Sequence, residues 1–95
     1  MRSRTVKWPT VARARLAAWQ AEDPKRRNQT EIAKALDVKA STVSRWVSGD
    51  ARPDDGAMRT AIERLTGIPA VTWKTADERA ADDALVARAA AAGAA

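Results

Sequence analysis

Two short helices, each with one apolar stripe of helical period and joined by only three residues, constrain this chain more than any other feature. The stripes comprise Ile32, Ala33 and Leu36, and then Val43, Trp46 and Val47. Each is too narrow to be buried alone, so the two helices must pack against each other and against further helices. The linking Asp37-Val38-Lys39 is long enough only for a sharp turn, with Val38 beneath it. The pattern predicts a helix-turn-helix hairpin.

Local signals mark the ends of both helices. Asn28, followed three residues later by Glu31, is an N-cap in a variant of the capping box. Asp37 occupies the turn position that requires a left-handed backbone, which Asp tolerates better than most residues. Gly49 ends the second helix as its C′ residue. These signals place the hairpin between residues 28 and 49.

The stretch QTEIAKALDVKASTVSRWVSGDARP, which begins at Gln29, resembles the lambda-repressor-like or Cro-type helix-turn-helix domains of phage and bacterial regulators. The similarity covers about residues 10–73, and its tail AIERLTGIPAVTW resembles Cro-like and YdaS-type small regulators in particular. Asp37 stands where the family usually has Gly. The resemblance implies an all-α, lambda-repressor-like domain of five or six helices that binds double-stranded DNA.

The second motif helix, about residues 40–48, is the expected recognition helix. With its apolar stripe turned inward, a short polar face without acidic residues points outward. Helix-turn-helix proteins insert the N-terminal part of this helix into the major groove. By resemblance, the residues expected to contact base edges are Ala40, Ser41, Thr42, Ser44 and Arg45. Arg45 is the strongest candidate because a guanidinium pairs bidentately with guanine; the alternative is a solvated helix arginine.

Phosphate contacts are expected around this helix, where cations and helix N-termini favour the DNA backbone. The expected residues are Lys25, Arg26, Arg27, Asn28, Gln29, Lys39, Ser48 and Arg52. For the loop 25–27 the alternative is a solvated surface.

The positive charge belongs to the first half of the chain. Residues 1–52 hold twelve Lys/Arg and five Asp/Glu, a net of +7, whereas residues 53–95 hold five and seven, a net of −2. Such a basic half fits a polyanionic partner, although it is equally a solubility feature. Residues 1–9 read as a flexible basic arm, in which Arg2, Arg4 and Lys7 either contact DNA or form a disordered terminus.

Helices on both sides of the hairpin complete the predicted domain, residues 10–74. Thr10 caps a first helix to about residue 21, with Ala12, Leu16 and Trp19 inward and Arg13 and Arg15 outward. After Pro53-Asp54-Asp55, a further helix carries Met58, Ile62 and Leu65 on one face and ends at Gly67. Val71 and Trp73 are then either part of the core or an exposed apolar patch for a partner chain.

Thr75 and Glu78 form a capping box that opens an Ala-rich C-terminal helix to about residue 91, within a helical tail of residues 75–95. Only Leu85 and Val86 supply bulky packing there, so tertiary anchoring should be weak. The helix is either a protruding tail or a contact with a second copy or a partner protein. We expect a homodimer on two DNA half-sites, with Val71, Trp73 and this helix contributing.

Composition excludes several classes of function. The 95 residues contain no Cys and no His, and the Asp54-Asp55 and Asp82-Asp83 pairs suit helix starts and surfaces, so we expect no catalytic residues, metal or cofactor. No apolar run approaches a membrane span and no secretory leader is evident, which favours a cytoplasmic, nucleoid-associated protein.

The sequence thus predicts a Cro-like or repressor-like, sequence-specific transcriptional regulator. The alternatives are a DNA-binding antitoxin of a toxin–antitoxin pair and a helical interaction adaptor that binds no DNA.

Overall fold

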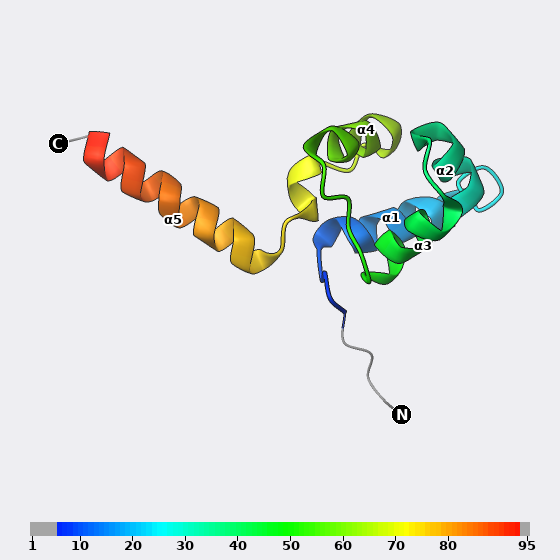
Figure 1. Cartoon of the computed structure of the whole chain (residues 1–95), viewed down its shortest axis with the longest axis horizontal. Helices are drawn as coiled ribbons and strands as arrows, with labels where there is room; N and C mark the ends of the chain where they lie inside the picture. Colours follow the sequence, from blue (N-terminus) through cyan, green and yellow to red (C-terminus); the bar gives the residue numbers. More distant parts are fainter. Residues whose placement is uncertain (1–5, 94–95) are drawn as a thin grey trace, which may run out of the picture.

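The computed structural model describes residues 6–93, which form five α-helices and one short 3₁₀ helix, with no strand in that range (Figure 1). The elements in order are α1 (Val11–Glu22), α2 (Gln29–Leu36), α3 (Ala40–Ser48), α4 (Gly56–Thr66), η1 (Ala70–Trp73) and α5 (Ala76–Gly93). The predicted all-α class is confirmed, with α2 and α3 as the helix-turn-helix hairpin.

Side-chain caps start the helices at the predicted positions. The Thr10 hydroxyl accepts a hydrogen bond from the Arg13 N–H (3.3 Å), and Asn28 Oδ1 accepts one from the Glu31 N–H (2.9 Å). The reciprocal bond of the predicted capping box, from the Asn28 N–H to the Glu31 carboxylate, is not present among the described residues. The Glu31 carboxylate lies 3.8 Å from Lys34 Nζ instead. Each cap satisfies a backbone donor that the first helical turn leaves without a partner.

The turn between α2 and α3 has the predicted left-handed geometry. Asp37 has φ +55°, and the following Val38 N–H donates to the Ala33 carbonyl (2.9 Å). Val38 is half-buried and packs against the core, so the expectation for this residue is also confirmed. An aspartate therefore performs here the task that the resemblance assigns to glycine.

A core shared by α1, α2, α3, α4 and η1 holds the domain together. Its buried apolar residues are Ala12, Leu16, Ile32, Ala33, Val43, Trp46, Ile62, Ile68 and Trp73. The Trp46 and Trp73 rings meet edge to face, with centroids 6.4 Å apart, a favoured aromatic arrangement. Leu65 is 38% exposed and lies outside this core, unlike Met58 and Ile62 of the same predicted face.

Trp73 belongs to the core and Val71 to the surface, which resolves the alternative left open by the sequence. Trp73 has no exposed surface, whereas Val71 is 56% exposed. The expected contribution of Trp73 to a dimer contact is therefore corrected. The ring is already covered by its own domain and has no surface to offer a second chain.

Helix α5 projects away from the other helices (Figure 1) and buries none of its side chains. Leu85 and Val86 are 63% and 67% exposed. The predicted capping box is present at the start of α5. The Thr75 N–H donates to Glu78 Oε1 (2.9 Å), and the Glu78 N–H donates to the Thr75 hydroxyl (3.2 Å). None of the helices within residues 6–93 is long and apolar enough to cross a membrane.

Candidate nucleic-acid interface

The outward face of α3 is short, polar and accessible. Val43 and Trp46 are buried on the inner side, while Ser41 and Arg45, one turn apart, are exposed. Ala40, Thr42 and Ser44 are half-buried beside them. The Arg45 side chain makes no hydrogen bond or ion pair with any residue of the described range 6–93, so its five N–H donors are available to a ligand.

The start of α3 leaves backbone donors without a side-chain cap. Lys39 occupies the N-cap position, and its side chain makes no capping hydrogen bond. The Lys39 carbonyl accepts from the Thr42 and Val43 N–H groups (3.0 and 3.3 Å). An uncapped helix start beside an exposed ammonium is a favourable place for a phosphate oxygen.

The start of α2 lies beside an open hollow between α1 and α2. Asn28 and Gln29 both line it. The Asn28 amide is used within the protein, since Oδ1 caps α2 and Nδ2 donates to the Lys25 carbonyl (3.0 Å). Gln29 is exposed in the first turn of α2 and is the member of this pair with a side chain open to a ligand.

The three cations before α2 differ in their surroundings. Lys25 and Arg26 are exposed. Arg27 is half-buried: its Nη1 donates to the Trp19 carbonyl (3.1 Å) and to Glu22 (2.8 Å), and its guanidinium lies 4.3 Å from the centre of the Trp19 ring. Arg27 therefore fastens the loop to α1, which leaves Lys25 and Arg26 as the freer cations.

The segment before α1 packs against the end of α3. The Trp8 N–H donates to the Gly49 carbonyl (3.0 Å), and Lys7 Nζ lies 5.9 Å from the centre of the Trp8 ring. Arg13 is only half-exposed, with a buried Nε, so the expectation that it points fully outward is corrected. Of the predicted basic arm, Arg2 and Arg4 lie outside the described residues.

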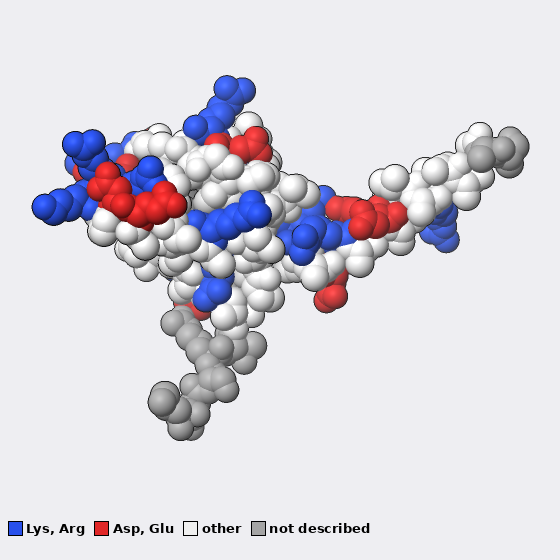
Figure 2. Space-filling model, turned by 180° about the vertical axis from the view of Figure 1, so that it is seen from behind, with Lys and Arg blue, Asp and Glu red and all other residues white. Residues whose placement is uncertain are grey.

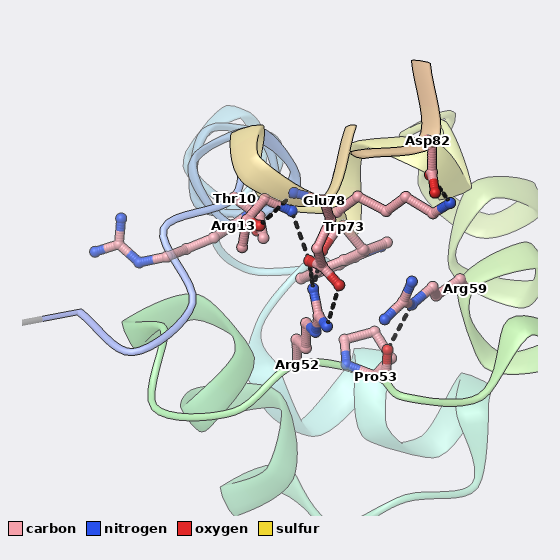
Figure 3. Close-up of polar contacts among 10 residues, drawn as sticks. Thr10, Arg13, Arg52, Pro53, Arg59, Trp73, Glu78 and Asp82 are labelled. Carbon is pink, nitrogen blue, oxygen red and sulfur yellow. Dashed lines mark hydrogen bonds and ion pairs between the residues drawn. The ribbon is translucent and has the colours of Figure 1, made fainter. Parts of the chain in front are cut away.

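Ser48 and Arg52, two of the predicted phosphate anchors, are engaged within the protein. The Ser48 hydroxyl donates to the Arg45 carbonyl (3.1 Å) and accepts from the Asp50 N–H (3.4 Å). The side chain of Arg52 is only 10% exposed. Its guanidinium binds both Glu78 oxygens and the Trp73 carbonyl (Figure 3) and stacks 3.8 Å from the Trp8 ring centre.

The expectation of a free phosphate anchor at Arg52 is therefore not met in this structure. The hydrogen bond from Arg52 is the main cause of a pKa of Glu78 well below its usual range, with the Thr75 N–H adding to it. The same bond raises the pKa of Arg52. A lowered carboxyl pKa stabilises the fold above the ordinary Glu range, and this contribution is lost only as the pH falls through the lowered value.

Charges are mixed on the face shown in Figure 2. Basic and acidic side chains lie together at the end of the domain away from α5, isolated Lys and Arg side chains cross its middle, and an acidic group marks the start of α5. The first turn of α5 contains Asp77 and Glu78. The charges do not form one continuous basic surface on this face.

A sequence profile of the helix-turn-helix family, the lambda-repressor and Cro-like type, matches residues 23–70, about half of the chain. The chain belongs to this family. It is a DNA-binding helix-turn-helix regulator, and the predicted resemblance is confirmed. Neither the curated proteins nor the solved structures contain a match to the chain.

The helix-turn-helix match runs from the loop before α2 to the beginning of η1. It contains α3 and every expected base-contacting and phosphate-contacting residue, but neither the basic N-terminal segment nor α5. The residues that sequence reasoning missed, Trp8 and Glu78 around Arg52, lie outside the match. The sequence identifies Glu78 only as a helix cap, because no spacing rule connects it to a cation 26 positions away.

Proposed function

We propose that this regulator reads a specific duplex sequence by placing the start of α3 in the major groove. The observation that carries the proposal is the exposed pair Ser41 and Arg45 on a helix whose opposite side is anchored in the core. A helix fixed in this way presents its outward side chains in one orientation, which base reading requires. Arg45 is the principal reader, and Ala40, Ser41, Thr42 and Ser44 complete the contact face.

Phosphate anchors hold the reader in register without contributing sequence preference. Lys39 is the first of these, because it is exposed at the uncapped start of α3. Lys25, Arg26 and Gln29 support it from the start of α2. Asn28, Arg27 and Ser48 contribute mainly by shaping the backbone, since their side chains are bonded within the protein.

One short helix contacts only a few base pairs, so we propose that specificity comes from a two-fold dimer on half-sites about 10 bp apart. Val71 and α5 are the exposed elements available for that contact. In this role the protein acts as a transcriptional repressor of the Cro type. The antitoxin alternative rests on α5 as well, because an 18-residue helix with no buried side chain is available to a partner protein.

Selection of random duplex DNA on the purified protein, followed by binding at several salt concentrations, tests the proposal. We expect a palindromic consensus, and an affinity whose logarithm falls by about 0.9 per neutralised phosphate for each unit of log salt. Lys39→Ala should reduce that slope by about 1 per subunit and leave the consensus intact. Arg64→Ala, which removes an exposed cation from the last turn of α4, is the charge-matched control and should leave the slope unchanged.

Two results would count against this function. An affinity that stays flat between low and physiological salt would exclude a phosphate-anchored reader and favour the adaptor alternative. A consensus altered by Lys39→Ala would mean that Lys39 reads bases and does not merely anchor the backbone.

A further inference from the structure

Arg52 lies where three segments of the chain meet. It follows the end of α3 by four residues, and the adjacent Ala51 N–H donates to the Arg45 carbonyl (3.2 Å), so its backbone continues directly from the recognition helix. The Trp8 ring from the N-terminal segment covers one side of its guanidinium, at 3.8 Å. Glu78, from the first turn of α5, accepts hydrogen bonds from the guanidinium of Arg52.

The contact with Glu78 has the geometry that an arginine uses for phosphate. Nη1 donates to Oε1 and Nη2 to Oε2, the latter at 2.9 Å. Such a parallel pair of hydrogen bonds is the arrangement that makes arginine suited to both carboxylates and phosphates. The Glu78 carboxylate therefore occupies the donors that a phosphate oxygen would need, and its charge cancels that of Arg52.

A second ion pair closes the same joint. Lys74 Nζ, from the residue between η1 and Thr75, binds Asp82 one turn beyond Glu78. Glu78 and Asp82, one turn apart on the same face of α5, thus form ion pairs with Arg52 and Lys74 (Figure 3). Beyond this joint the helix buries no side chain, so its position relative to the domain depends on these polar contacts.

We propose that the first turn of α5 is an autoinhibitory element, which withholds Arg52 from the DNA backbone by binding it through Glu78. The inference rests on the proposed function. When α5 swings away at Lys74 and Thr75, or is captured by another molecule, the Nη1 and Nη2 donors that Glu78 occupied become available to a phosphate. Nη1 still binds the Trp73 carbonyl and the ring of Trp8 still covers one side of the guanidinium, so Arg52 stays in place after the end of the recognition helix. Binding of α5 and binding of DNA are then coupled through one arginine.

A double-mutant cycle on the full chain tests the Arg52–Glu78 lock, which is the autoinhibitory contact that withholds Arg52 from DNA. Glu78→Gln keeps the helix cap, since glutamine also serves in a capping box, but removes the charge that holds Arg52. Asp83→Asn is the matched control, because it removes an equal charge from an exposed position of the same helix. Salt-dependent affinity for one duplex is measured for the native chain, both variants, Arg52→Gln and Glu78→Gln/Arg52→Gln, with helix content checked by circular dichroism.

We expect Glu78→Gln to bind more tightly at low salt and to gain about 0.9 per subunit in the slope of log affinity against log salt. One extra phosphate contact makes affinity fall about 3.5-fold more steeply between 50 and 200 mM salt. Asp83→Asn should keep the native slope. Arg52→Gln should leave the slope unchanged in the native background and remove the gain in the Glu78→Gln background.

Equal slopes for the native chain, Glu78→Gln and Asp83→Asn would overturn the lock while leaving the DNA-reading function in place. So would a slope lowered by Arg52→Gln alone, because Arg52 would then reach phosphate with Glu78 still present. Binding by Glu78→Gln but not by the native chain would support the lock in its strongest form. Failure of every variant to bind duplex DNA would contradict both the lock and the proposed function.

Discussion

Trp73→Ala is expected to destabilise the domain by about 3–5 kcal/mol, the cost of truncating a large buried aromatic side chain. Trp73 is fully buried and packs edge to face on Trp46, so its removal leaves a cavity beside the recognition helix. Small domains have only about 5–15 kcal/mol of stability in total. Urea unfolding followed by circular dichroism should show a large fall in the midpoint, and Trp46→Ala should behave similarly.

Two matched variants separate cavity formation from other causes. Val71→Ala, two residues earlier on an exposed side chain, should change the free energy of unfolding by no more than about 0.5 kcal/mol. Trp73→Phe should cost less than Trp73→Ala, because a phenyl ring refills most of the cavity that alanine leaves. The buried Trp73 Nε1 has no hydrogen-bond partner in the described residues, so its loss removes no bond. A stable Trp73→Ala protein would place Trp73 outside the core.

Gly49→Ala is expected to have the second-largest effect, through backbone conformation and crowding together. Gly49 has φ +84°, a region that costs other residues roughly 1–2 kcal/mol. A Cβ at this position would lie 2.3 Å from Val6 Cγ1 and 2.9 Å from Arg13 Nε. Displacing these groups adds about 1–3 kcal/mol, the usual cost of overpacking.

Gly67→Ala provides the control for backbone conformation alone. Gly67 has a similar φ of +79°, but a Cβ there would meet no atom within 4 Å. The difference in unfolding free energy between the two variants therefore measures the packing of the N-terminal segment on the end of α3. Equal effects of Gly49→Ala and Gly67→Ala would show that this packing contributes little.

The local parts of the fold were predictable because their causes are local. Thr10, Asn28 and Thr75 each cap a helix by accepting a hydrogen bond from a backbone N–H three residues later. Asp37 and Gly49 take left-handed conformations directly after the helices that they end. The inward and outward faces of α3 follow from its 100° periodicity alone. The candidate reading face could therefore be assigned before its surroundings were known.

Contacts between distant segments were not predictable in this way. Spacing placed Arg52 beside the recognition helix, but its pairing with Glu78 depends on how η1 directs the chain into α5. Arg13 was assigned outward by helical phase, whereas the close approach of the N-terminal segment to Gly49 covers its Nε. Trp73 is buried for a similar reason, since η1 folds back onto α1 and α4.

Base reading by Arg45 is the central claim, and it is tested most directly by comparing Arg45→Ala with the native chain on the selected operator and on its single-base-pair variants. The free energy of unfolding should stay within about 0.5 kcal/mol of native, because the side chain is exposed. Discrimination should fall by about 1–3 kcal/mol at one base pair per half-site and remain native at the others. Unchanged affinity and unchanged preference at every base pair would contradict the placement of the recognition face on α3.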